Sequence, residues 1–118
     1  MKRLLLGGAV FFATFAMAPV ASAQYAAIAG GYGAIGTADG YGSMESARAA
    51  AVAECRQRGG GSCSKSTAER SHWYFSVGYC NGEPYTGASP QGAGRAEQIV
   101  RAKGAADGYG NCYIEYTF

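Results

Sequence analysis

The chain has 118 residues, with 10 Lys or Arg and 8 Asp or Glu, for a formal net charge of +2. The excess comes entirely from two basic residues at positions 2 and 3, so residues 24–118 carry no net charge. A neutral segment lacks the basic footprint of nucleic-acid-binding domains and of proteins drawn to anionic membrane surfaces. The sequence therefore predicts no nucleic-acid partner, and its length allows one small domain.

The first 23 residues have the pattern of a secretory signal peptide. Two basic residues precede an apolar run from Leu4 to Ala18, and a proline and the small-residue triplet ASA follow. The apolar run of about 15 residues is short for a bilayer-spanning helix, which needs roughly 20. We therefore expect cleavage after Ala23, no membrane span after cleavage, and a secreted or periplasmic protein whose single domain is residues 24–118.

The segment QYAAIAGGYGAIGTADGYG, residues 24–42, predicts a hairpin of two short strands joined by glycines. Ser43 is a suitable N-cap for a helix of about 15 residues, and Gly59 is available to end it. An apolar stripe at spacings of three and four runs along this helix: Met44, Ala47, Ala51 and Cys55. The stripe directs Cys55 toward the core, and a closing strand is expected to complete the unit.

The segment HWYFSVGYC, residues 72–80, predicts a strand, and the Asn-Gly pair at 81–82 predicts a tight hairpin into a partner strand. A helix is expected after Pro90, with inward-facing Ala93, Ala96, Val100 and Ile99. The final segment CYIEYTF, residues 112–118, alternates and predicts a half-buried strand. Its two faces are expected to hold Cys112, Ile114, Tyr116 and Phe118 on one side and Tyr113, Glu115 and Thr117 on the other.

The two halves of the chain align without a gap at an offset of 49 residues. The aligned pairs include Tyr25 with Tyr74, Ile28 with Val77, Gly33 with Gly82, Ala47 with Ala96, Gly61 with Gly110 and Cys63 with Cys112. This recurring order predicts two pseudo-repeated strand-strand-helix-strand units, residues 24–69 and 73–118. The predicted fold class is a small disulfide-stapled α+β domain with mainly antiparallel sheet.

Four cysteines in an exported chain of this size predict two disulfides. Gly104 stands where the repeat places the counterpart of Cys55, so Cys112 needs another partner, and Cys80 is the remaining cysteine of the second unit. We therefore predict the pairs Cys55 with Cys63 and Cys80 with Cys112. Neither the close ligand spacing typical of structural zinc nor the C-x-x-C spacing of redox pairs occurs, so no metal site is expected.

Several motifs between Tyr25 and Cys112 together resemble the secreted bacterial family called domain of unknown function 4189: YAAIA, GYG, SARAAAVAEC, GGGSC, CNG and GYGNC. The resemblance covers nearly all of the chain after residue 23. It implies an exported, disulfide-containing α+β domain, with relatives among secreted effectors and cell-envelope proteins. It carries over no catalytic residue.

The sequence shows no catalytic constellation, so we expect no enzyme activity. An enzyme acting through His72, the one histidine, is the weakest hypothesis, because residues adjacent along a strand point to opposite faces and do not converge with their neighbours. The segment GYGAIG, residues 31–36, formally matches a dinucleotide-binding motif. The motif should be followed at once by a helix, but a hairpin is predicted here, so no cofactor is expected.

The nine tyrosines all lie after residue 23, a region without leucine, so many are expected to fill the core. Five aromatic residues are predicted to form an exposed patch for partner binding: Trp73, Tyr79, Tyr85, Tyr109 and Tyr113. The leading hypothesis is a non-catalytic exported interaction domain that binds a protein or cell-envelope component. The alternative is an inhibitor or immunity protein that caps a secreted hydrolase, since a rigid domain lowers the ordering cost of binding.

Overall fold

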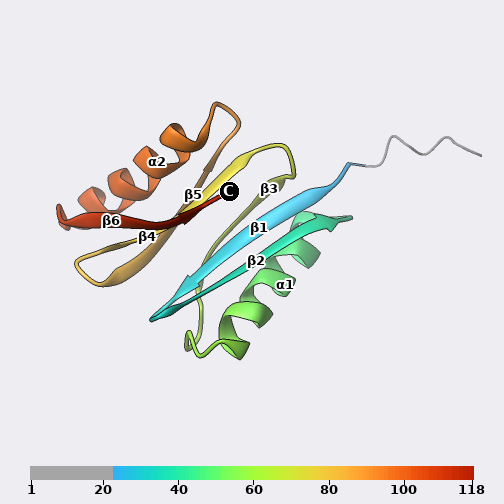
Figure 1. Ribbon diagram of the computed structural model, residues 1–118, viewed down its shortest axis with the longest axis horizontal. Coiled ribbons are helices and arrows are strands. Elements are labelled where there is room, and N and C mark those ends of the chain that lie inside the picture. The colour runs from blue at the N-terminus through green and yellow to red at the C-terminus, as the bar shows by residue number, and fades with distance from the viewer. Residues whose placement is uncertain (1–22) are drawn as a thin grey trace, which may run out of the picture.

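The computed structural model describes residues 23–118, which fold as two successive units of the same element order (Figure 1). The first unit consists of β1 (Tyr25–Gly31), β2 (Ala34–Tyr41), α1 (Met44–Gln57) and β3 (Lys65–Arg70). The second consists of β4 (Tyr74–Cys80), β5 (Glu83–Ser89), α2 (Ala93–Ala106) and β6 (Cys112–Thr117). The predicted signal peptide occupies residues 1–23, so all but its last residue lies outside the described range.

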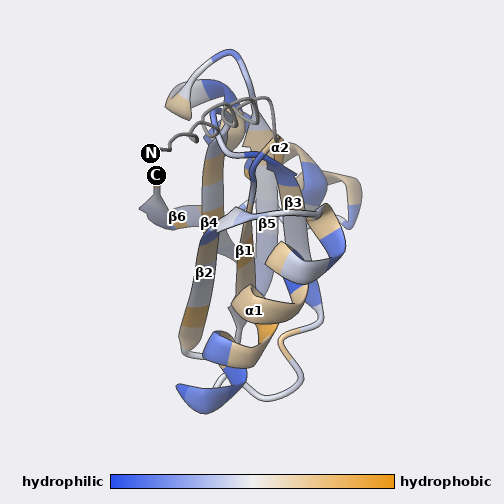
Figure 2. Ribbon diagram, turned by 90° about the vertical axis from the view of Figure 1, so that its right-hand side faces the viewer, coloured by the Kyte–Doolittle hydropathy of each residue, from blue (hydrophilic) through white to orange (hydrophobic). Residues whose placement is uncertain are grey.

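Each unit forms one antiparallel three-stranded sheet, with strand orders β2-β1-β3 and β5-β4-β6. Each sheet carries its own helix on its outer face, and the inner faces pack together with β1 over β4 and β3 over β5 (Figure 1). Seen from the side of α1, the helix lies in front of its sheet (Figure 2). The four layers run helix, sheet, sheet, helix, which confirms the predicted α+β class and the two strand-strand-helix-strand units.

The central strands β1 and β4 are buried on both faces. Successive side chains of a strand point to opposite faces, so each strand contributes to two cores, one beneath its helix and one between the two sheets. The outer face of β1 packs Ala27 and Ala29 against α1. The inner faces of the two sheets share a second cluster: Ala26, Ile28, Phe75 and Val77. The helix approaches its sheet closely, because a Cβ at Gly36 would collide with the carbonyl oxygen of Ala51.

The expectation that many tyrosines fill the core is wrong. Two of the nine, Tyr79 and Tyr85, are buried, whereas five are at least 38% exposed: Tyr32, Tyr41, Tyr74, Tyr113 and Tyr116. The space between helix and sheet in the first unit is filled mainly by alanine, and Tyr25, which packs against this cluster, is only partly buried. Five of the nine tyrosines therefore keep much of their surface at the outside of the described residues.

Helix α1 begins and ends where the sequence predicts. The Ser43 hydroxyl accepts a 3.1 Å hydrogen bond from the Ser46 amide, and Gly59 follows the helix with a φ of +91°. The buried side of the helix holds Ala47, Ala51 and Cys55. Met44, expected on the same stripe, is the first residue of the helix and is 43% exposed, because helix side chains tilt toward the N-terminus, where no further turn precedes it.

The second unit confirms the predicted hairpin and helix. Asn81 and Gly82 both have positive φ, +56° and +86°, as a two-residue hairpin turn of the Asn-Gly type requires. Helix α2 turns Ala96, Val100 and Gly104 toward its sheet. Two other residues expected to face inward, Ala93 and Ile99, are half-buried.

The predicted alternation of β6 is wrong after Ile114. Gly78 of β4 pairs with Ile114, and the next residue of β4, Val77, pairs with Tyr116. Glu115 is thus the extra residue of a β-bulge, a feature common at sheet edges. The bulge reverses the side-chain directions of every residue that follows it.

As a result, Tyr116 and Phe118 lie on the same face as Tyr113 rather than opposite it. The Phe118 ring stacks on Phe75 of the inter-sheet core, with 5.1 Å between ring centroids. Thr117 turns toward α2 instead, where its hydroxyl is 3.0 Å from a Glu97 carboxylate oxygen. The bulge therefore gathers the aromatic side chains of β6 on the inner side of the second sheet.

The two disulfides are the pairs that the repeat predicts: Cys55 with Cys63 and Cys80 with Cys112. They fill corresponding places in the two units. In the first unit the counterpart of Cys80 is Gly31, where a Cβ would lie 2.8 Å from Cys63 Sγ. In the second unit the counterpart of Cys55 is Gly104, where a Cβ would collide with Cys80 Sγ. Each unit thus has cysteine at two of three equivalent positions and glycine at the third.

Candidate binding groove

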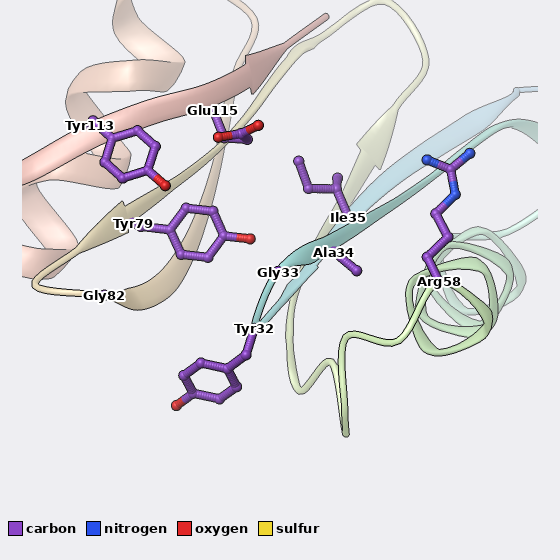
Figure 3. A pocket seen from close by; sticks show the side chains of 9 residues that line it. All are labelled: Tyr32, Gly33, Ala34, Ile35, Arg58, Tyr79, Gly82, Tyr113 and Glu115. Carbon is purple, nitrogen blue, oxygen red and sulfur yellow. The ribbon is translucent and has the colours of Figure 1, made fainter.

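A groove of about 470 Å³ opens between β2, at one edge of the first sheet, and β6, at one edge of the second (Figure 3). At the other edges β3 packs against β5, so the two sheets are closed together there. The volume lies in the range of ligand pockets, roughly 300 to 1,000 Å³. We name this feature the aromatic groove and define it by its lining residues: Tyr32, Gly33, Ala34, Ile35, Arg58, Tyr79, Gly82, Tyr113 and Glu115.

One wall of the groove is a pair of tyrosines from neighbouring strands. Tyr79 and Tyr113 are cross-strand partners of β4 and β6, with ring centroids 5.6 Å apart. Tyr79 is 8% exposed, and its hydroxyl donates a 2.8 Å hydrogen bond to the Gly31 carbonyl oxygen. Burial raises the pKa of Tyr79, and the Glu115 carboxylate adds to the rise. Tyr113 is 57% exposed, so a rigid inner ring supports an accessible outer one.

The opposite wall comes from the β1–β2 turn and the start of β2. Tyr32 is 61% exposed at the turn, which Gly33 completes with a φ of +83°. The Tyr32 hydroxyl donates a 2.6 Å hydrogen bond to Glu83 of the second unit, and this bond raises the pKa of Tyr32. Ile35 points between the sheets and packs on the inter-sheet core, which makes the floor apolar.

Charges of both signs lie at the rim. Arg58 stands on the α1 side, 3.2 Å from the Glu54 carboxylate, and Glu115 projects from the bulge of β6. The tyrosines Tyr32 and Tyr79 have raised pKa values, so they are uncharged hydroxyls at neutral pH. The groove therefore offers aromatic faces, neutral hydrogen-bonding groups and one charge of each sign, a set suited to binding an uncharged or mixed-charge segment.

The five aromatic residues predicted as one exposed patch are divided among three places. Tyr79 and Tyr113 line the aromatic groove. Tyr85 lies on the opposite face of the second sheet, 5% exposed, in an edge-on pair with Tyr109 at a centroid distance of 6.5 Å. Trp73 is half-buried against the inter-sheet core. The patch fails as one surface because Tyr79 and Tyr85 belong to strand positions of opposite parity.

The groove also includes residues that the sequence reasoning did not single out: Tyr32, Ile35, Arg58 and Glu115. The sequence pattern around Tyr32 does indicate an exposed side chain, because a bulky residue between two glycines at a turn is held outside the sheet. No sequence pattern placed Arg58 or Glu115 at the groove, because neither a helix C-cap nor a β-bulge indicates where its side chain lies in space.

No hydrogen bond of the His72 side chain is found within residues 23–118. The predicted strand over residues 72–80 is wrong at its start: β4 begins at Tyr74, so His72 is exposed in the turn between β3 and β4, away from the groove lining. The hydroxyl of the adjacent Ser71 donates a 2.6 Å hydrogen bond to Asp39 of β2. Within residues 23–118, no group of three or more His, Cys, Asp or Glu is placed to hold a metal ion. None of the helices in this described range combines the length and apolar character needed to cross a membrane.

Comparison of the chain with protein-family models, with curated proteins and with solved structures finds no significant match in any of the three. The resemblance to domain of unknown function 4189 stays a prediction.

Proposed function

We propose that this chain is an exported, non-catalytic binding module that holds a segment of a partner protein in the aromatic groove. One observation carries the proposal: Tyr32 and Tyr113, on facing walls of a single groove, are 61% and 57% exposed. Large apolar side chains that face solvent together mark interaction sites more often than chance exposure does. The groove thus supplies two accessible aromatic anchors above an apolar floor.

A protein partner fits the groove better than a polyanion does. Tyrosine is enriched among the residues that dominate protein interfaces, because it covers much area with few rotatable bonds. Arg58 and Glu115 add one charge of each sign at the rim, which suits a peptide segment with mixed charges. The hydrogen bonds of Tyr32 to Glu83 and of Tyr79 to Gly31 hold two walls in place before binding, which lowers the ordering cost.

Export is supported by the two disulfides and by the signal-peptide pattern of residues 1–23. Disulfides persist mainly in oxidising compartments such as the periplasm or the extracellular space. The partner is therefore expected in the cell envelope or among secreted proteins.

Site-specific photo-crosslinking in the native host tests the proposal. A photoreactive aromatic residue replaces Tyr32 or Tyr113 in the groove, and in matched controls it replaces Tyr41 or Tyr74, which are 38% and 42% exposed outside it. We expect a discrete crosslinked protein from the two groove positions and none from the two controls. The same products from all four positions, or none from any, would contradict the proposal.

The identified partner then allows a measurement of affinity and a choice between hypotheses. Tyr113→Ala should weaken binding by about 2 kcal/mol or more, as loss of a central aromatic anchor does, whereas Tyr74→Ala should leave it unchanged. Equal losses in both variants would contradict a groove site. A hydrolase partner that loses activity on binding would favour the inhibitor hypothesis over a general interaction domain.

A further inference from the structure

A second pocket lies at the closed edge of the two sheets, away from the aromatic groove. It has a volume of about 380 Å³ and is formed by β3, β5 and the end of α2. Lys65 of β3 and Lys103 of α2 line it together with Tyr85 and Thr86 of β5. We name this feature the lysine pocket.

Every lysine of the described residues lines the lysine pocket. The full sequence contains Lys2, Lys65 and Lys103, so residues 23–118 hold two lysines, and both line this pocket. The Lys103 Nζ donates a 2.7 Å hydrogen bond to the Thr86 carbonyl oxygen. The Lys65 Nζ lies 4.4 Å from the centroid of the Tyr85 ring. Two ammonium groups from distant parts of the sequence therefore meet at one pocket.

Within residues 23–118, neither ammonium group is neutralised by an ion pair. The ion pair found within residues 23–118 joins Arg58 to Glu54, outside this pocket. Like charges brought together in a partly buried place raise the energy of the folded state. Burial and the charge of Lys65 together lower the pKa of Lys103. A bound anion would remove this repulsion.

The one carboxylate of the pocket is already engaged. Asp107, at the end of α2, accepts a 2.6 Å hydrogen bond from the Tyr85 hydroxyl. Two ammonium groups and one carboxylate leave a single positive charge, which a singly charged anion balances. Ser64 and Ser66 also line the pocket and offer hydroxyl groups to such a ligand.

We propose that the lysine pocket binds a singly charged oxyanion, of the carboxylate or phosphodiester class. Lys103 has three N–H donors and uses one on Thr86, so donors remain for a ligand, and Lys65 supplies the second charge. The pocket lies on the opposite edge from the aromatic groove, so its ligand and the partner of the groove are separate.

A titration followed by NMR of lysine side chains tests this site in the purified protein. The chain has three lysines, so labelling their ε-carbons gives a small set of signals that Lys65→Gln and Lys103→Gln assign. The probes are acetate for the carboxylate arm and dimethyl phosphate for the phosphodiester arm, with tetramethylammonium chloride at equal ionic strength as the control. We expect the Lys65 and Lys103 signals to shift together and saturate with at least one oxyanion, and not with the control salt.

Variants decide whether the two lysines act as a site. Lys65→Gln should weaken oxyanion binding about tenfold, whereas the matched control Arg101→Gln, which removes a charge from α2 outside the pocket, should leave it unchanged. Asp107→Asn should tighten binding, since it removes a repelling charge while the amide oxygen can still accept the Tyr85 bond. Lys65 is exposed, so its variant remains informative even where Lys103→Gln unfolds the protein.

Two results would overturn the lysine pocket as a site. The first is a set of shifts that never saturate and follow ionic strength alone. The second is an equal loss of binding in Lys65→Gln and Arg101→Gln, which would indicate diffuse attraction by net charge. Neither result bears on the aromatic groove, whose crosslinking test uses other residues.

Discussion

The hydroxyl of Tyr79 donates a 2.8 Å hydrogen bond to the carbonyl oxygen of Gly31, and so joins the central strand of the second unit to that of the first. The repeat aligns Tyr79 with Gly30, where a Cβ would lie 2.8 Å from Val77 Cγ2. At these equivalent positions the second unit has a large side chain, whereas the first unit has a glycine that leaves room for Val77. This complementarity holds the inner wall of the aromatic groove against the first sheet.

Tyr79→Phe should lower the free energy of unfolding by about 1 kcal/mol, because it removes one buried hydrogen bond and leaves the Gly31 carbonyl without this donor. Chemical denaturation measures the change. Tyr113→Phe is the matched control, since no hydrogen bond of its hydroxyl is found among residues 23–118 and its ring is 57% exposed. Equal stability of the two variants would show that the bond contributes nothing.

The equivalence of the two disulfide sites predicts that the second bridge can be transferred. In the double variant Cys80→Gly with Gly104→Cys, the new thiol should pair with Cys112, because a Cβ at position 104 lies 3.0 Å from Cys112 Sγ. Non-reducing peptide mapping should find this bridge, while Cys80→Gly alone should leave Cys112 as a free thiol. Two free thiols in the double variant would contradict the equivalence.

Gly104→Ala should destabilise the oxidised protein by about 1 to 3 kcal/mol, the usual cost of overpacking, because the added methyl group collides with Cys80 Sγ. Gly94→Ala on the same helix is the matched control, since an added Cβ there meets nothing within 4 Å. That substitution should be neutral or stabilise by up to about 1 kcal/mol through helix propensity. Thermal denaturation compares the two, and similar losses would contradict close packing at Gly104.

The hydrogen bond to Asp107, together with burial, raises the pKa of Tyr85 from 10.0 to about 12. Between these values the folded protein keeps the proton that the unfolded chain has lost, so unfolding is increasingly favoured as the pH rises. The stabilisation is complete below pH 10 and is lost as the pH approaches 12. Unfolding across this range should show a steeper loss of stability than in Tyr85→Phe. Identical pH profiles would contradict the shift.

Much of the fold followed from short-range patterns. The Ser43 cap and the Asn81-Gly82 turn act within a few residues, and the offset of 49 residues follows from direct comparison of the two halves. The structure confirms the elements that these features predict. The disulfide pairs followed from the same comparison, because Gly104 left Cys80 as the partner of Cys112. The cap and the turn depend on backbone preferences that the chain carries locally, whereas the disulfide pairs depend on the equivalence of the two units.

Other features depended on contacts between segments that are distant in the sequence. The bulge at Glu115 arises from the pairing of β6 with β4, and it reverses the directions of Tyr116 and Phe118. The surroundings of Tyr79 and Tyr85 likewise depended on the packing of both sheets, because Tyr79 faces the first unit whereas Tyr85 lies in the core beneath α2.

The sequence by itself determined the repeat, the elements and the two bridges, because periodicity and turn chemistry act over short stretches of chain and comparison of the two halves left Cys80 as the partner of Cys112. Only the tertiary structure decided where the aromatic surface lies and where the two lysines meet. Burial at a strand position depends on what covers that face, and the inter-sheet core around Ile28 and Phe75 closes the β3–β5 edge while the β2–β6 edge stays open.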